Sequence, residues 1–281
     1  MRTDRKKKHW FLKYPLVPAF VLPTVGIVGI ALLLQLLLTA MLAIFGDGIR
    51  SFQELPDVLN SVLRILLAFC MILVMKKSSG GQFQFGFHKN NLWPSVLFSM
   101  VSMSVVLSNL MEYSAAGLPL HNTWKGVAIA ALSGIAPGFF EEVVCRGIVV
   151  SNMMRRWKNK DRYMEKTVLL SGLAFGLVHL INLANGDISG TILQILYAAA
   201  LGIFFGGVFV RTHNLWGPVI LHSLIDFSAF IFNGEAETTA FTVTSSIGIT
   251  IIYTAVGLYL IRRKKQDEIR ELWEEQGEEE L

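Results

Sequence analysis

Ionisable side chains inside long apolar segments are the residues of this chain that could do chemistry. They are Glu141, Glu142 and Arg146 in one segment, His179 in the next, and His222 and Asp226 in a later one. Each such group costs about 2.5–3.5 kcal/mol in hydrocarbon on insertion scales, so these groups tend to face a bundle interior and to mark function. A carboxylate can activate a water and an imidazole can donate to developing negative charge. Together they could hydrolyse an amide bond.

The spacing of these residues is that of an α-helix. Glu142 and Arg146 are four residues apart with the acid first, the favourable order for an ion pair on one helix face. Glu141 is rotated by about 100° from Glu142. We therefore expect Arg146 to hold one carboxylate while the other points into a cavity. His222 and Asp226 also share a face, and we expect Asp226 to fix the tautomer of His222.

The elements that position these residues are apolar helices. The chain is 53% hydrophobic and 16% charged, with a mean hydropathy of +0.51, which excludes a soluble globular domain. Eight runs approach the ~20 residues that cross a hydrocarbon core. They lie at 24–45, 57–75, 92–111, 127–154, 167–183, 189–210, 214–232 and 241–261. The sequence predicts an all-α polytopic membrane protein with about eight transmembrane helices.

The basic residues predict the orientation of these helices. Lys and Arg gather in the N-terminal segment, in loops 76–91 and 155–166, at Arg211 and at 262–265, whereas the alternate loops are poor in them. By the positive-inside rule both termini are cytoplasmic. The expected parts are a basic cytoplasmic segment 1–23, a transmembrane domain 24–262 and a charged tail 263–281. The net charge of +4 reflects this topology, and nothing points to nucleic acid.

The depths of the polar residues allow them to meet. At about 1.5 Å per residue, Glu141 lies roughly 20 Å, His179 roughly 18 Å and His222 roughly 12 Å from the cytoplasmic end of its helix. We expect them to converge slightly to the cytoplasmic side of the midplane. Pro137 should loosen the helix before Glu141, and Trp216-Gly217-Pro218 should begin a helix shortly before His222.

Three motifs carry a resemblance to a known family. E-E-x-x-x-R (Glu141, Glu142, Arg146), F-x-x-x-H (Phe175, His179) and H-x-x-x-D (His222, Asp226) occur in this order within about 127–232. They resemble the CPBP family of intramembrane proteases, also called Abi, or CAAX protease and bacteriocin-processing, which includes the type II CAAX prenyl endopeptidases. That branch often has Asn in the last motif, so Asp226 leaves the substrate class open.

The resemblance implies a role for each motif residue. Glu141 would be the general base, with His179 beside it. His222 and Asp226 would stabilise the oxyanion or share in holding a metal, while Glu142 and Arg146 would orient Glu141 and Phe175 would pack against the catalytic groups. Glu141, His179 and His222 are also ligand types of a catalytic zinc site. Because no H-E-x-x-H is present, the sequence leaves both a zinc enzyme and a metal-free enzyme open.

The predicted function is therefore an intramembrane endopeptidase in the plasma membrane of a prokaryote. Its substrate would be a membrane-associated peptide or protein that enters from the cytoplasmic side, such as a signalling peptide or a bacteriocin leader. Two alternatives stay open: a non-catalytic scaffold or immunity protein on the same fold, and a proton-coupled transporter. The transporter is disfavoured because the E-E-x-x-x-R helix has no second copy.

Three further features complete the expectations. Arg64 lies about two turns inside its helix, so we expect it to snorkel to the outer interface. Glycines four residues apart at 134 and 138, 172 and 176, and 202 and 206 predict that their three helices form a tight cluster. The tail, with its closing run of acids, is expected to be a solvated helix that frays.

Overall fold

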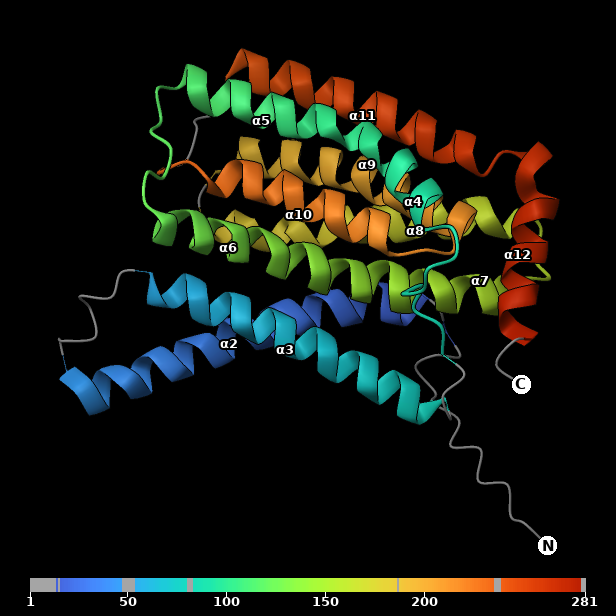
Figure 1. Ribbon diagram of the computed structural model, residues 1–281, viewed down its shortest axis with the longest axis horizontal. Coiled ribbons are helices and arrows are strands. Elements are labelled where there is room, and N and C mark those ends of the chain that lie inside the picture. Colours follow the sequence, from blue (N-terminus) through green and yellow to red (C-terminus); the bar gives the residue numbers. More distant parts are fainter. Residues whose placement is uncertain are drawn as a thin grey trace, which may run out of the picture.

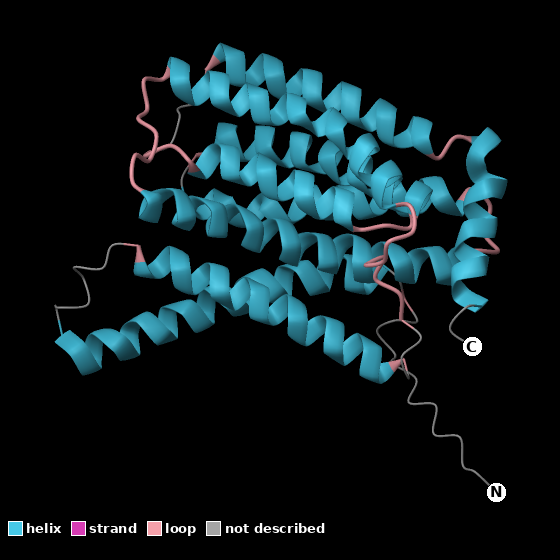
Figure 2. Cartoon of the chain, viewed as in Figure 1, coloured by secondary structure: helices cyan, strands magenta, loops and turns pink. Residues whose placement is uncertain are grey.

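Helices form the framework of the molecule (Figure 2). In the described residues, seven continuous helical spans are long and apolar enough to cross a membrane. The computed structural model describes residues 14, 16–46, 54–79, 83–185, 187–234 and 239–278. Within these ranges the only β structure is an isolated bridge between Leu120 and Phe232. The all-α polytopic fold predicted from the sequence is thus confirmed.

The helices that carry the membrane domain have the following bounds. They are α2 (Leu16–Phe45), α3 (Leu55–Ser78), α4 (Leu92–Ser99), α5 (Met103–Ala115), α6 (Trp124–Glu142), α7 (Ser151–Trp157), α8 (Tyr163–Val178), α9 (Ile188–Thr212), α10 (Trp216–Phe230) and α11 (Ala240–Leu260). Three short segments continue these helices: the 3-10 turn Met100–Ser102, the π-helix Val143–Val150 and the 3-10 segment His179–Asn185. A final helix, α12 (Gln266–Glu278), follows the 3-10 turn Arg263–Lys265.

One of the eight expected spans, 214–232, is shorter than predicted. It corresponds to α10, which has 15 residues. At 1.5 Å per residue it extends about 22 Å, less than the ~30 Å of a hydrocarbon core. The predicted span began at 214, but residues 213–215 form a buried loop before α10, and hydrophobicity alone does not distinguish such a loop from the start of a helix.

The beginning of the first helix also differs from the expectation. Helix α2 begins at Leu16, inside the segment 1–23 that was expected to be cytoplasmic. The basic residues at 2–13, Arg50 and the last residues of the tail lie outside the described residues.

The helix starts follow from local sequence. The side chains of Thr123 and Asp187 accept hydrogen bonds from the backbone N–H groups of Gly126 and Gly190, which caps α6 and α9. Thr239 and Thr242 form a reciprocal capping box at the start of α11. Each cap satisfies a backbone donor that the first turn of a helix leaves unpaired.

The helices lie roughly side by side, with α2 and α3 crossing along one edge (Figure 1). Helix α3 packs on α6, and α2 packs on α8 and α3. The interior of the bundle is formed by α6, α8, α9 and α10. Three of these helices, α6, α8 and α10, carry or lead into the three motifs. The motif-bearing part is therefore enclosed, while α2 and α3 form an outer pair.

Glycines allow two of the interior pairs to approach closely. A Cβ at Gly138 would lie 2.5 Å from Oγ of Ser223, and one at Gly134 would lie 2.6 Å from the backbone N of Phe227, both on α10. A Cβ at Gly172 would lie 2.6 Å from the backbone N of Ile203 on α9. The three predicted spans do contact one another, but only α8 and α9 do so through their glycines. Helix α6 uses its glycines against α10, while α8 uses its glycines against α9, because spacing shows a helix face and not what faces it.

The tail is packed rather than solvated. Helix α12 crosses one end of the bundle (Figure 1), with Ile269 fully buried. The ring of Trp273 lies 4.0 Å from that of His213, and its Nε1–H donates to the backbone oxygen of Val210. The apolar residues of α12 return on one face, a pattern that the high density of acids obscured.

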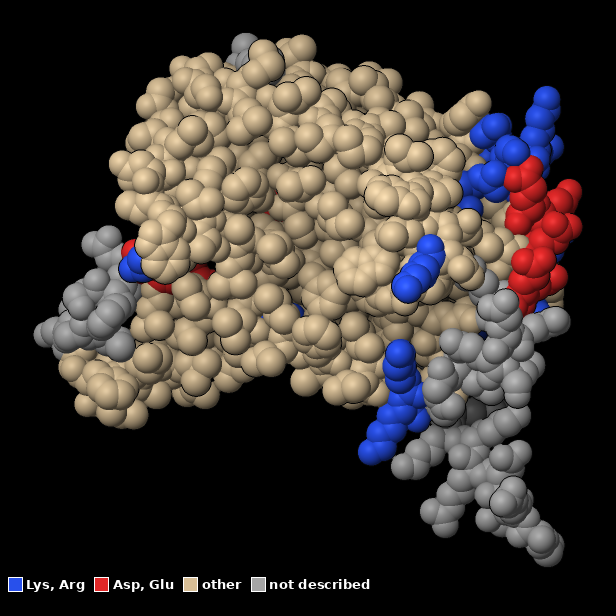
Figure 3. Space-filling view, viewed as in Figure 1, with Lys and Arg blue, Asp and Glu red and all other residues tan. Residues whose placement is uncertain are grey.

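The basic side chains gather at the end of the molecule that carries α12 (Figure 3). The end of α3, the loop between α7 and α8, and the start of the tail all lie there (Figure 1). This agrees with the charge alternation in the sequence. The orientation of the two ends relative to the cytoplasm stays a prediction.

Candidate active site

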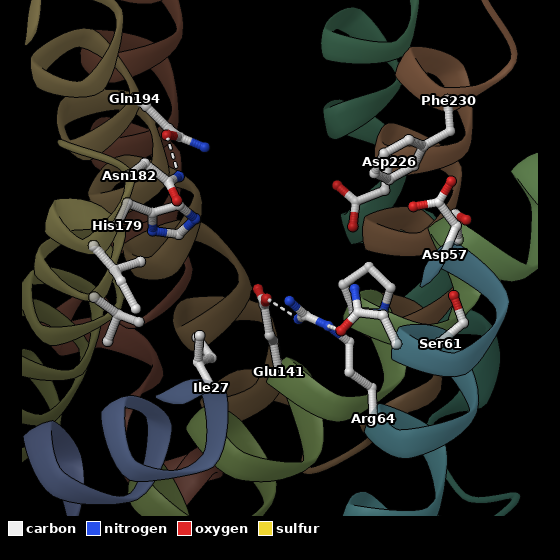
Figure 4. A pocket seen from close by; sticks show the side chains of 15 residues that line it. Ile27, Asp57, Ser61, Arg64, Glu141, His179, Asn182, Gln194, Asp226 and Phe230 are labelled. Carbon is white, nitrogen blue, oxygen red and sulfur yellow. Dashed lines mark hydrogen bonds and ion pairs between the residues drawn. The ribbon is translucent and has the colours of Figure 1, made fainter. Parts of the chain in front are cut away.

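A polar cavity of about 310 Å³ lies between the outer pair and the motif-bearing helices. Its walls come from α2, α3, α6, α8 with the 3-10 segment that follows, α9 and α10. Glu141, His179 and Asp226 line it, as expected for site residues, and they approach from different helices (Figure 4). The cavity thus joins three of the residues that the motifs singled out.

Glu141 faces this cavity and is paired across helices. Its Oε1 accepts a hydrogen bond of 3.1 Å from Nη1 of Arg64 on α3, and the two side chains are 14% and 18% exposed. The expectation that Arg64 snorkels to the interface was wrong. Its side chain turns inward because a carboxylate lies within reach, and an ion pair offsets part of the cost of a charge in the membrane.

Glu142 points to the other side of α6 and is fully buried. Its Oε1 accepts a hydrogen bond of 2.7 Å from Nη1 of Arg146, and this contact is the expected ion pair four residues apart. Arg146 also donates to the backbone oxygen of Gly202 at 3.4 Å, and its guanidinium lies 4.7 Å from the ring centre of Phe175. The two neighbouring carboxylates therefore have different surroundings, as their rotation around the helix indicated.

His222 is oriented by Glu142 and not by Asp226. Its Nδ1 lies 2.8 Å from Oε1 of Glu142, whereas Nε2 lies 3.8 Å from Oδ2 of Asp226, which is beyond hydrogen-bond distance. Since a carboxylate paired with Arg146 can only accept, Nδ1 carries the proton. The expected role of Asp226 in fixing the tautomer is thus taken by Glu142. No spacing rule could show this, because the contact joins residues 80 positions apart.

The free nitrogen of His222 faces both cavity carboxylates. Its Nε2 lies 3.8 Å from Oε2 of Glu141 and 3.8 Å from Oδ2 of Asp226. A separation above 3.5 Å between polar groups is one where a bridging water is to be considered. The arrangement places a base, an imidazole nitrogen and a second carboxyl group around one point.

His179 lies at the end of α8, where the α-helix changes into a 3-10 turn. Its Nδ1 lies 3.0 Å from the backbone oxygen of Phe175, which leaves Nε2 for the cavity. The ring of Phe175 lies between the two imidazoles, with centres 5.3 Å from His179 and 5.9 Å from His222. The expected packing role of Phe175 agrees with these contacts.

The backbone around the two acids departs from a regular α-helix. Pro137 lies within α6 without ending it and borders the cavity, and the π-helix Val143–Val150 begins directly after Glu142. Irregular backbone within membrane helices is tolerated where it is enclosed by protein or lines a cavity, and π segments are frequent at functional sites. As expected, α10 begins at Trp216, which sets His222 about two turns into it.

The site residues include the donor types of a zinc site but do not form one. No group of three His, Cys, Asp or Glu side chains in the described part of the chain is placed to hold a metal ion. Glu141, His179 and His222, the ligands that the resemblance implied, thus have fitting chemistry without a fitting arrangement in this structure.

The cavity extends away from the basic end of the molecule. Its outer walls are Asp57 in the first turn of α3 and Phe230 at the end of α10, whereas the basic residues lie at the opposite ends of the helices. The sequence predicted that the substrate enters from the cytoplasmic side and that the site residues converge slightly to that side of the midplane. Both stay predictions, as does the orientation of the two ends of the molecule.

Comparisons with known proteins agree with the three motifs. Residues 123–228 match the family described as type II CAAX prenyl endopeptidase Rce1-like, a stretch that contains every motif residue. Neither a curated protein nor a solved structure matches the chain significantly. The match agrees with the resemblance read from the motifs over residues 123–228, and the seven membrane-capable helical spans indicate an integral, multi-pass membrane protein.

Proposed function

We propose that this protein is an intramembrane endopeptidase that hydrolyses a peptide bond in a membrane-associated protein or peptide. The observation that carries the proposal is the position of Glu141, whose Oε2 faces Nε2 of His222 across 3.8 Å on the wall of a polar cavity. A base and an imidazole at this separation can share one water. The family match to a group of proteases supports the same reaction class.

In the proposed reaction, Glu141 takes a proton from the water as the oxygen adds to the carbonyl carbon of the substrate. The tetrahedral intermediate carries negative charge, which a protonated His222 stabilises through Nε2–H. The C–N bond then breaks, and the proton held by Glu141 passes to the leaving nitrogen. Glu142 supports this step because it accepts from Nδ1 and so stabilises a positive imidazole.

The substrate would approach from the end where Asp57 lies, because the cavity extends that way. Its segment must be unwound, since a peptide bond is protected while it lies in a helix. We propose the plasma membrane of a prokaryote as its location and a signalling peptide or a bacteriocin leader as its substrate class.

Comparative peptidomics tests the proposal and names the substrate. Membranes from cells with the wild-type protein are compared with membranes that contain an equal amount of Glu141→Gln. We expect a small set of peptides that only the wild type releases. Identical peptides in both samples would overturn the enzyme and leave a scaffold as the function of this fold.

Zinc is proposed as an alternative and tested separately, because Glu141, His179 and His222 would have to move closer together than they lie here to hold it. If bound there, it would supply a Lewis acid for the water or the carbonyl. About one zinc per chain in protein purified without chelator, and less in His179→Ala, would support this alternative. Full peptide release by a sample shown to be free of metal would exclude zinc.

A further inference from the structure

The catalytic residues of the proposed enzyme all lie in 123–228, but one charged contact to them comes from outside this domain. Arg64 belongs to α3, and its Nη1 lies 3.1 Å from Oε1 of Glu141. The contact joins residues 77 positions apart. The cavity thus contains a cation that the family domain does not supply.

The face of α3 that carries Arg64 is polar and lines the cavity. Asp57, Asn60, Ser61 and Arg64 all line it, and their spacing of three, four and seven residues places them on one side of a helix. From Ile65 to Met75 α3 is apolar, with Leu66, Phe69 and Leu73 more than half exposed. A helix with one polar face in a membrane turns that face inward, so the position of Arg64 follows from the whole side of α3.

Arg64 is itself held in place. Its Nε lies 3.5 Å from Oδ1 of Asn60, one turn earlier, while Nη1 reaches Glu141. The guanidinium is planar, so two contacts fix its orientation as well as its position. Figure 4 shows it pointing from α3 across the cavity toward Glu141.

The contact with Arg64 also gives the two carboxylate oxygens of Glu141 different partners. Oε1 is occupied by Arg64, and Oε2 is the oxygen that faces Nε2 of His222 at 3.8 Å. Among the described residues, no other hydrogen bond to the carboxylate of Glu141 is present. Without Arg64, no hydrogen bond among the described residues would fix the rotation of this carboxylate.

We propose that Arg64 is a positioning residue, which holds Oε1 of Glu141 so that Oε2 stays directed at His222 and at the water between them. The inference rests on the proposed function and deepens it. Arg64 acts through Glu141 and does not bind the substrate. Its loss should therefore lower kcat and leave KM nearly unchanged, because misplacement of a reacting group by about 1 Å can cost about 100-fold in rate.

The experiment compares four variants with the wild type in liposomes: Arg64→Gln, Arg64→Lys, Glu141→Gln and Lys125→Gln. The probe is the peptide released most strongly in the peptidomics comparison, resynthesised with its flanking residues and an internal quencher. Lys125→Gln is the matched control, because it also removes a cation paired with a glutamate, Glu54, but on the exposed surface outside the cavity.

We expect kcat of Arg64→Gln to fall at least about 10-fold with little change in KM. Arg64→Lys should recover part of the lost kcat, because lysine keeps the positive charge but lacks the planar guanidinium group. Lys125→Gln should behave as the wild type. Arg64→Lys also guards against misfolding, since it retains a cation for Glu141. Wild-type kcat in Arg64→Gln would overturn the positioning role, and so would a loss that appears in KM alone or that Lys does not relieve.

The failure of the proposed function has a separate signature. If Glu141→Gln releases the probe as fast as the wild type, the enzyme assignment falls and Arg64 has no catalytic group to position. If Glu141→Gln is inactive while Arg64→Gln is unimpaired, the enzyme stands and only the role of Arg64 is overturned.

Discussion

The two sides of α6 carry neighbouring carboxylates in opposite surroundings. Glu141 is on the cavity side, 14% exposed, and its cation comes from the outer helix α3. Glu142 is on the buried side, 0% exposed, and accepts hydrogen bonds from both Arg146 and His222, which lie within residues 123–228. The difference teaches that one helix separates two tasks. The buried side fixes the geometry, and the cavity side presents the group that can exchange protons with water.

The largest effect on stability is expected on the buried side. Arg146→Met would leave Glu142 without its cation in the interior, and removing one partner of a buried ion pair costs about 3–5 kcal/mol. We expect a marked drop in the midpoint of thermal unfolding in detergent.

The control for this prediction is Lys125→Met, which removes a cation that is 58% exposed and should cost less than about 1 kcal/mol. Equal losses in both variants would show that the buried side of α6 has no special importance for the fold.

A smaller loss is expected where α6 meets α10. In Gly138→Ala the new Cβ would lie 2.5 Å from Oγ and 2.7 Å from N of Ser223, the residue after His222. Helix α10 must then shift, at a cost of about 1–3 kcal/mol, and His222 should move away from Glu141. Unfolding temperature and peptide release should both fall.

Gly248→Ala is the opposite case, because nothing lies within 4 Å of a Cβ there and alanine favours a helix over glycine. It should be neutral or stabilising. A Gly138→Ala protein that unfolds at the wild-type temperature with full activity would contradict the close contact between α6 and α10.

The packed tail should contribute less than either side of α6. Trp273→Ala removes the contact with His213 and the hydrogen bond to Val210, but the ring is only partly buried. We expect a loss of about 1–2 kcal/mol, below the 3–5 kcal/mol that is usual for a fully buried ring. Glu275→Ala on the exposed side should have no effect, and an equal effect of both changes would mean that α12 is not docked.

The smallest effect is a pH dependence of the tail contact. Hydrogen bonds from Lys265 and Arg211 lower the pKa of Glu268 below its usual value of 4.5. Because the folded-state pKa is the lower one, the stabilisation is present above pH 4.5 and is lost as the pH falls through the folded-state pKa. The rate of amide hydrogen exchange in 266–278, corrected for its intrinsic pH dependence, should rise as the pH falls through the folded-state pKa of Glu268. Glu268→Gln should remove this rise.

The sequence predicted what depends on spacing within one helix. The ion pair of Glu142 with Arg146, the opposite direction of Glu141 and the start of α10 at Trp216 all follow from helical geometry. These features require no knowledge of the neighbouring helices.

Contacts between helices could not be predicted in the same way. The bond from Arg64 to Glu141 and the bond between His222 and Glu142 join residues 77 and 80 positions apart. The position of the cavity likewise depends on how six helices and one 3-10 segment are arranged. One signal was present for Arg64: Asp57, Asn60 and Ser61 share its face, which is unusual for a residue that would snorkel toward lipid headgroups.

The central claim is tested most directly by exchanging each of the two neighbouring acids for its amide. Glu141→Gln and Glu142→Gln are purified beside the wild type, and release of the probe peptide and thermal unfolding are measured on the same samples. We expect Glu141→Gln to lose at least about 100-fold in kcat with only a small drop in the unfolding midpoint, because it weakens the pair with Arg64, whereas Glu142→Gln unfolds at a clearly lower temperature. A Glu141→Gln protein with wild-type turnover, or two variants that lose stability equally, would contradict it.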